Sequence, residues 1–164
     1  AFGTGTHPTT QLCLMAIERH LQPEQEVIDL GTGSGILAIA AAKLGAKHVW
    51  AYDIDEESIR AAHENAAANQ VAGTLSIMRG SLTELLAAGA QAPLVLANIL
   101  ARILVDLFER GLAGLVAPGG LIVLSGILDT QAFEVVAALK MAGLEVAAEE
   151  RIEDWVAIFA RKPL

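Results

Sequence analysis

A glycine-rich segment that joins a predicted strand to a predicted helix constrains the fold of this chain more than any other feature. Residues 27–30 (Val-Ile-Asp-Leu) are mostly apolar and partly β-branched, which is typical of a short buried strand. The segment Gly31-Thr32-Gly33-Ser34-Gly35 follows directly, and residues 36–44 are rich in helix formers. Because a tight glycine turn lets a ligand lie against the backbone at a helix N-terminus, the segment predicts an α/β unit with a binding site.

The rest of the chain repeats this alternation of short strands and helices. The further predicted strands cover residues 48–53, 74–78, 94–98 and 121–124, with a turn at 118–120, and a final hairpin covers 145–151 and 155–161. The predicted helices cover residues 11–21, 36–44, 56–69, 82–88, 99–112 and 131–142. This order implies a parallel sheet with helices on both faces, in which the hairpin makes the last strand antiparallel. We expect a single α/β domain over residues 1–164.

Composition and charge exclude several classes of protein. The 164 residues are 54% hydrophobic with a net charge of -8, and Cys13 is the only cysteine. The apolar content excludes a disordered chain, and one cysteine excludes a disulfide-stapled fold. Because the basic residues are scattered, nucleic-acid binding is disfavoured and a small or cationic partner is favoured. Neither a membrane span nor a signal peptide is expected, and the opening Ala1 suggests that an upstream segment was removed.

The spacing of the glycines indicates which class of ligand the turn could bind. A dinucleotide-binding turn follows G-x-G-x-x-G, whereas this segment reads G-x-G-x-G and has Ile36 where the last glycine would stand. The spacing favours a nucleoside with a smaller charged tail over a pyrophosphate; the alternative is a connection that binds nothing. The chain shows no metal-ligand spacing, no G-x-S-x-G turn and no G-x-x-x-x-G-K-S/T loop.

Asp53 closes the second predicted strand and is a candidate ligand contact. A carboxylate there can accept hydrogen bonds from both hydroxyls of a ribose. The alternative is that Asp53 or Asp55 only caps the following helix, and we expect Asp55 to cap while Asp53 binds the ribose. Ser81, after the third strand, is expected near an adenine ring.

Asn98 follows a strand that is otherwise wholly apolar. Its position at the carboxyl end of a central strand is where open α/β sheets bind ligands, and its carbonyl oxygen can accept a hydrogen bond from an amine. The alternative is a turn residue that bonds its own backbone.

The opening segment, residues 1–10, holds two glycines and four threonines. Thr10 is expected in the first turn of the helix at 11–21, where it either caps the helix or contacts a ligand. His7 is a candidate general base, although a single loop histidine is more often incidental. Trp155 is expected to pack in the hairpin.

Four segments together resemble the bacterial methyltransferases that modify protein eleven of the large ribosomal subunit, at the base of its stalk. They are residues 1–10 (AFGTGTHPTT), 29–37 (DLGTGSGIL), 97–100 (ANIL) and 124–128 (LSGIL). The resemblance covers essentially the whole chain. It implies a seven-stranded, Rossmann-like class I methyltransferase sheet, S-adenosylmethionine as cofactor, and a cytoplasmic enzyme that methylates the α-amine and lysine ε-amines of its ribosomal protein, up to trimethylation.

The resemblance also implies roles for individual residues. The family's cofactor contacts correspond to Thr10, Gly31, Asp53 and Asn98, to which the glycine turn adds Gly33. Asn98 and the carbonyls after it would receive the target amine. The family's N-terminal substrate-recognition domain is not in this sequence, so the chain resembles the catalytic domain alone.

We expect a direct in-line displacement, in which a neutral amine attacks the sulfonium methyl and the protein positions the two reactants. Three alternatives stay open. The first is a methyltransferase of the same fold for another protein or a small-molecule amine. The second is a nicotinamide-dependent oxidoreductase, which the glycine spacing opposes. The third is a non-catalytic cofactor-binding module.

Overall fold

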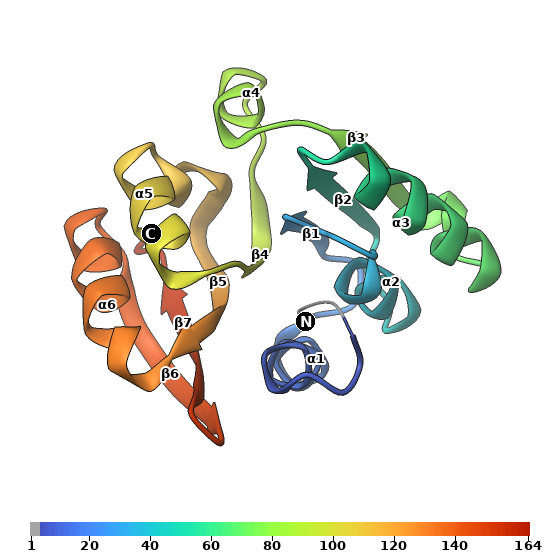
Figure 1. Ribbon diagram of the computed structural model, residues 1–164. Coiled ribbons are helices and arrows are strands. Elements are labelled where there is room, and N and C mark those ends of the chain that lie inside the picture. The colour runs from blue at the N-terminus through green and yellow to red at the C-terminus, as the bar shows by residue number, and fades with distance from the viewer. Residues whose placement is uncertain (1–3) are drawn as a thin grey trace.

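Seven strands form one mixed sheet in the computed structural model, which describes residues 4–164. The strands are β1 Glu26–Leu30, β2 His48–Asp53, β3 Leu75–Arg79, β4 Ala92–Asn98, β5 Val116–Leu128, β6 Glu145–Ile152 and β7 Trp155–Arg161. Their order across the sheet is β3-β2-β1-β4-β5-β7-β6 (Figure 1). Neighbours from β3 to β5 are parallel, while β7 is antiparallel to both β5 and β6. The predicted sheet with an antiparallel last strand is confirmed.

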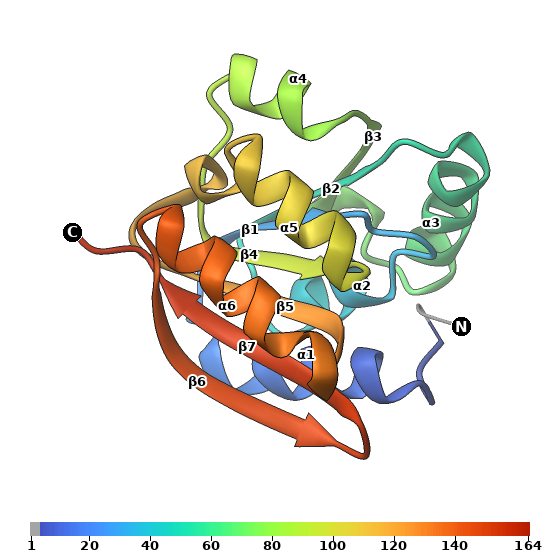
Figure 2. The same ribbon diagram turned by 60° about the vertical axis from the view of Figure 1, so that its left-hand side comes forward.

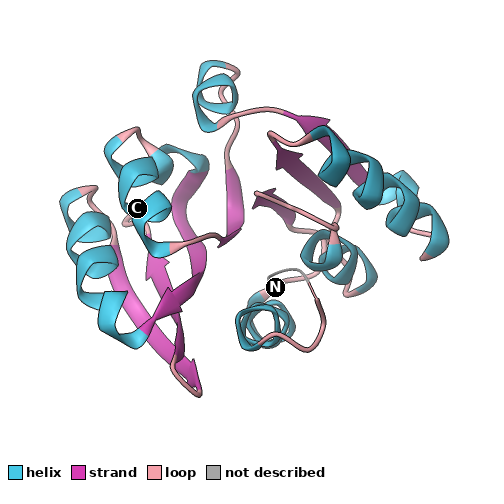
Figure 3. Cartoon of the chain, viewed as in Figure 1, coloured by secondary structure: helices cyan, strands magenta, loops and turns pink. Residues whose placement is uncertain are grey.

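Helices cover both faces of this sheet, as Figures 2 and 3 show. They are α1 Pro8–His20, α2 Ile36–Lys43, α3 Glu56–Ala68, α4 Leu82–Ala87, α5 Ala101–Glu109 and α6 Ala132–Met141. The first three pack on one face, and α4, α5 and α6 pack on the other. None of the helices within residues 4–164 is long and apolar enough to cross a membrane.

Side chains of the central strands alternate between two hydrophobic cores, one under each layer of helices. In β4, Val95 and Ala97 pack with α5 and α6, whereas Leu94 and Leu96 pack with α1 and α2. All four side chains are fully buried. A strand covered on both faces buries successive residues in opposite directions, which explains why β4 reads as a continuous apolar run.

The turn predicted at residues 118–120 is instead part of a longer strand. Gly119 has a φ of 77°, and its N–H donates to the carbonyl of Lys162 at 2.8 Å, so this irregular backbone pairs with the C-terminal segment. At its other end β5 continues to Leu128, which pairs with Trp155 at the start of β7. The prediction was too short because both extensions depend on strand partners that are distant in the sequence.

The first helix begins three residues earlier than predicted. His7 is its N-cap, because Nδ1 of the imidazole accepts a hydrogen bond from the N–H of Thr9 at 3.2 Å. Pro8 occupies the first helical position, where its fixed φ is favourable and its missing N–H costs nothing. Thr10 therefore lies inside the first turn, and the alternative in which Thr10 caps the helix is wrong.

Candidate active site

The glycine-rich segment turns sharply at the carboxyl end of β1. Gly31 and Gly33 have positive φ angles of 73° and 56°. The N–H groups of Gly31 and Thr32 both donate to the carbonyl of Tyr52, at 2.9 and 2.8 Å. A Cβ atom on Gly31 would lie 3.3 Å from the side chain of Ile99. Because β1 lies between β2 and β4, where the strand order reverses, this turn occupies the place at which open α/β sheets bind ligands.

Asp53 is bound to this turn from the end of β2. Its Oδ2 accepts from the N–H of Gly33 at 2.9 Å, and its Oδ1 accepts from the N–H of Asp55 at 3.0 Å. Asp55 caps α3, as predicted, by accepting from the N–H of Glu57 at 3.3 Å and from the hydroxyl of Ser58 at 3.1 Å. Asp53 is thus not the cap, and its carboxylate faces the glycine turn.

Asp29, in β1, binds a side chain of the glycine turn, and this role was missed by the sequence reasoning. The hydroxyl of Thr32 donates to its Oδ2 at 2.7 Å, and both residues are buried. Burial raises the pKa of Asp29 to about 6, against the hydrogen bond from Thr32, and the nearby Asp53 raises the pKa further. The available signal was a carboxylate within an otherwise apolar strand, directly before the glycines, because a buried acid requires a dedicated partner.

Asn98 ends β4 and is tied to the start of α1. Its Nδ2 donates to Oγ1 of Thr9 at 3.4 Å, and Oγ1 of Thr9 lies 2.7 Å from Nδ1 of His7. Since Nδ1 already accepts from the N–H of Thr9, the threonine hydroxyl donates to it as well. This chain of hydrogen bonds fixes the orientation of the amide, whose Oδ1 is buried without a partner among the described residues.

His7 is partly buried and contacts the hairpin of β6 and β7. Its ring lies edge-to-face with Trp155, with ring centroids 5.1 Å apart. Burial is the main factor that lowers the pKa of His7, while the charge of Glu153 acts in the opposite direction. Trp155 therefore packs against the start of α1, a contact that the sequence did not indicate.

A cavity of about 350 Å³ opens beside the glycine turn, between β2, α4 and α5. Its lining is mostly apolar and includes two acids and one arginine. The residues are Leu30, Gly31, Asp53, Ile54, Gly80, Ser81, Leu82, Thr83, Ile99, Ile103, Asp106, Leu107 and Arg110. Such a slot suits a flat heterocycle joined to a hydroxyl-rich sugar.

The structure brings together only some of the predicted site residues. Gly31, Asp53 and Ser81 line the cavity, whereas Gly33 lines a shallower pocket on the α3 side of the turn. Asn98 lies just beyond the cavity, next to Ile99 of its lining. Thr10 is buried in α1. No group of three or more histidine, cysteine or acidic residues within 4–164 could hold a metal ion.

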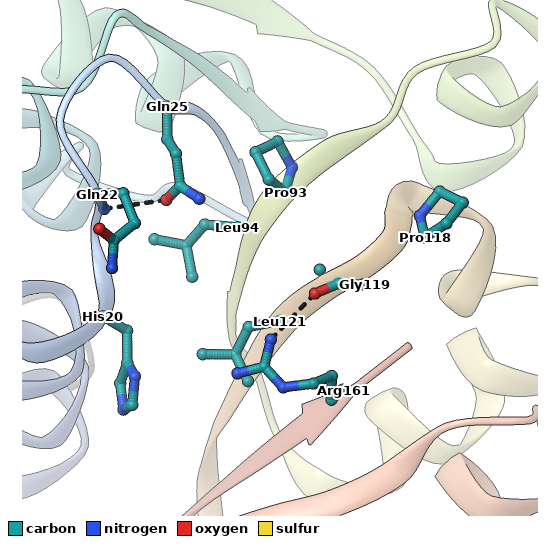
Figure 4. A pocket seen from close by; sticks show the side chains of 10 residues that line it. His20, Gln22, Gln25, Pro93, Leu94, Pro118, Gly119, Leu121 and Arg161 are labelled. Carbon is teal, nitrogen blue, oxygen red and sulfur yellow. Dashed lines mark hydrogen bonds between the residues drawn. The ribbon is translucent and has the colours of Figure 1, made fainter. Parts of the chain in front are cut away.

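A second pocket, of about 220 Å³, lies at the opposite ends of the central strands (Figure 4). It is formed around the amino-terminal ends of β4 and β5, where Arg161 donates to the carbonyl of Gly119 at 3.0 Å. The glycine turn follows the carboxyl end of a parallel strand, and this pocket lies at the amino-terminal ends, so the two sites are separate.

The strand order, the antiparallel β7 and the glycine turn at the switch point define a class I, S-adenosylmethionine-dependent methyltransferase fold. A family model described as ribosomal protein L11 methyltransferase (PrmA) matches residues 1–163. The chain belongs to this family.

Similar proteins support the assignment. The ribosomal protein L11 methyltransferases of Exiguobacterium sibiricum and Listeria monocytogenes are each 46% identical over 162 residues, which is 99% of this chain. The chain covers 50% and 51% of these relatives, so it spans about half of their length.

Solved structures agree with this result. A ribosomal protein L11 methylase from Lactobacillus delbrueckii subsp. bulgaricus has a TM-score of 0.89 at 39% identity, covering 98% of this chain and 81% of that one. Trm5 of Methanocaldococcus jannaschii has a TM-score of 0.81 at 16% identity, covering 96% of this chain and 50% of that one, and shares the fold.

Proposed function

We propose that this chain binds S-adenosylmethionine and methylates amines of ribosomal protein L11, both the α-amine and lysine ε-amines. The observation that carries the proposal is the buried Oδ1 of Asn98, which has no partner among the described residues and lies at the carboxyl edge of the sheet beside the cavity. An unsatisfied buried acceptor is costly, and an amine donor would satisfy it. Family membership gives the substrate class.

The residues present fit the proposed cofactor. Gly31 has a φ of 73° and Gly33 a φ of 56°, with nothing within 4 Å of the Cβ position of Gly33, so a ligand could approach that backbone closely. Asp53 would accept from the ribose hydroxyls with the lone pairs that its two backbone hydrogen bonds leave. The family resemblance also implies a contact from Thr10, which is fully buried in α1 and lines neither pocket beside the turn. When bound, S-adenosylmethionine supplies a methyl group on a sulfonium, and as the methyl–sulfur bond breaks the sulfur leaves as a neutral thioether that needs no acid.

The chain's own contribution is to hold and orient the amine. Oδ1 of Asn98 would accept one N–H, which points the nitrogen lone pair away from the amide. A free lysine has a pKa near 10.4, so the site must favour the uncharged amine. The apolar surroundings of Ile99 and Trp155 would do so by removing water, and the departing proton would pass to solvent.

The proposal also covers the domain organisation, the type of substrate and the cellular location of the reaction. We propose that residues 1–164 form one catalytic domain and that the further length of the relatives serves substrate recognition. The net charge of -8 supports a protein substrate, the stalk-base protein itself, rather than ribosomal RNA. A ribosomal substrate supports action in the cytoplasm.

Mass spectrometry tests the proposal. The chain is incubated with S-adenosylmethionine and purified ribosomal protein L11, and the substrate is weighed intact; each methyl group adds about 14 Da. Methylated amines support the proposal, and Asn98→Ala should lower kcat by roughly tenfold or more at saturating substrate. An unmodified substrate, with S-adenosylhomocysteine still bound in calorimetry, would refute methylation of ribosomal protein L11 by this chain alone, without the further length of its relatives. Absence of binding would refute the cofactor.

A further inference from the structure

The pocket at the amino-terminal ends of β4 and β5 differs in charge from the rest of this acidic chain (Figure 4). Leu94 and Leu121 line it with buried side chains, and its polar side chains come from the end of α1, the loop after α1 and the end of β7. No acidic residue of the described chain lines it, although the sequence holds 19 acids against 11 basic residues. A hollow without negative charge on an acidic protein favours an anionic ligand.

Arg161 supplies positive charge to this pocket from the end of β7. Its register partner on β5 is Leu121, so both side chains lie on the same face of the sheet, and Figure 4 shows the guanidinium beside Leu121. Nη1 of Arg161 donates to the carbonyl of Gly119 at 3.0 Å, which leaves Nη2 and Nε as further donors. Arg161 forms no ion pair within residues 4–164, even though Glu145 is its register partner on β6. Its charge is therefore available to a ligand.

Gln25 presents an N–H donor of fixed orientation. Its Oε1 accepts from the backbone N–H of Gln22 at 3.0 Å, so Nε2 is the amide atom left to donate. Figure 4 shows this nitrogen turned away from Gln22, toward the space above Leu94. The side chain of Gln25 thus meets a ligand as a donor.

His20 adds a buried ring nitrogen to the same pocket. Nε2 of its imidazole is buried and has no hydrogen-bond partner among the described residues, and its ring lies edge-to-face with Phe159 at a centroid distance of 5.2 Å. Burial is the main factor that lowers the pKa of His20, followed by the charges of Arg19 and Arg161, whereas Glu150 acts in the opposite direction. Because a buried polar atom without a partner is costly, a ligand that accepts from Nε2–H would be stabilising here.

We propose that this pocket binds a small oxyanion, either a phosphate group or a carboxylate. The guanidinium of Arg161 and the Nε2–H groups of Gln25 and His20 donate to its oxygens, and hydrogen bonds of a charged group to such an anion are the strong ones. Arg161 is exposed, so the anion enters from solvent without rearrangement of the chain. This is a second ligand site, independent of the glycine turn and of methyl transfer.

Calorimetric titration with sodium phosphate and, separately, with sodium acetate tests the inference, at constant ionic strength. The wild-type chain should bind at least one of the two with a Kd of about a millimolar, and the tighter one shows whether the group is a phosphate or a carboxylate. Imidazole NMR signals locate the binding. The signal of His20 should shift and its pKa should rise, because an anion nearby favours the charged ring, while the signals of His48 and His63 should stay unchanged.

Gln25→Glu is the sharpest variant. Its carboxylate keeps the acceptor for the Gln22 N–H but replaces the donor in the pocket with a negative charge. Binding of the anion should weaken by at least about tenfold, and Arg161→Gln should weaken it by roughly as much. Gln70→Glu is the matched control, because it adds the same charge at an exposed position after α3, outside the pocket, where salt screens it. The control should keep the wild-type affinity.

Thermal melting should show that all three variants fold, and their affinity for S-adenosylhomocysteine should equal that of the wild type. The inference is overturned if neither anion binds, if Gln25→Glu binds as tightly as Gln70→Glu, or if the anion leaves the His20 signal unmoved. The proposed function would stand in each of these cases, because none of them involves the glycine turn or Asn98.

Discussion

Nδ2 of Asn98 donates a hydrogen bond to Oγ1 of Thr9 at 3.4 Å, across 89 residues of sequence. The contact joins the end of β4 to the first turn of α1. It decides that Nδ2 of the amide is held by the protein and that Oδ1 is the atom left without a partner among the described residues. The orientation of Asn98 is thus a property of two segments together.

Thr9→Val should show whether the orientation of the Asn98 amide affects kcat separately from the affinity for the cofactor product. Valine keeps the shape of this buried side chain but removes the hydroxyl, so the amide of Asn98 loses its partner. We expect kcat for amine methylation to fall roughly tenfold, with the affinity for S-adenosylhomocysteine changed much less. Thr9→Ser should restore kcat because it restores the hydroxyl. An unchanged kcat in the valine variant would show that the contact does not orient Asn98.

Asp53 and Asp55 should respond differently to alanine. Asp53→Ala removes the acceptor for the Gly33 N–H and for a ribose, so the affinity for S-adenosylhomocysteine should fall by about tenfold or more. Asp55→Ala removes a helix cap, which should lower the free energy of unfolding by about 1 kcal/mol and leave affinity nearly unchanged. Calorimetry and urea denaturation measure the two effects. Equal affinity losses would contradict the division of roles between the two acids.

Gly31→Ala should damage both the fold and the binding site. Alanine is strained at a φ of 73°, and its Cβ would lie 3.3 Å from Ile99. Gly143→Ala is the control, since Gly143 has a φ of 90° with nothing within 4 Å and lies beyond the end of α6. Both variants should lose about 1 kcal/mol or more of stability, measured by denaturation. Only Gly31→Ala should lose affinity for S-adenosylhomocysteine.

Asp29 should make stability depend on pH. Burial raises its pKa to about 6, so between about pH 4 and pH 6 the folded chain holds this proton more tightly than the unfolded chain. The free energy of unfolding therefore falls as the pH rises through that window, and the full penalty is present above it.

Asp29→Asn should remove this dependence. Between pH 4 and pH 7.5 the wild-type chain should lose about 1–3 kcal/mol relative to the variant. Urea denaturation at both pH values measures the difference, so that any pH-independent cost of the asparagine cancels. Glu109→Gln, an exposed change, should follow the wild type. Parallel pH profiles for the wild type and Asp29→Asn would contradict the assignment.

Much of the fold was predictable because its signals are local. The strand at residues 48–53 agrees in both bounds with β2, since a run of apolar and aromatic residues before an acid is recognisable within a few positions. The cap at Asp55 was predictable for the same reason: an N-cap bonds its own helix. The glycine turn was predictable because positive φ angles at Gly31 and Gly33 select glycine whatever lies around them.

The sequence by itself therefore determined the succession of strands and helices along the chain, the glycine turn after the first strand and the residue types placed there. Only the tertiary structure decided that His7 caps α1, that Thr9 orients Asn98, and that Asp106 and Arg110 join the cavity of Asp53. The physical reason is that these relationships depend on side chains brought together by packing of the sheet and helices. A periodic pattern reports which face of its own element is buried, but not which distant residue that element meets.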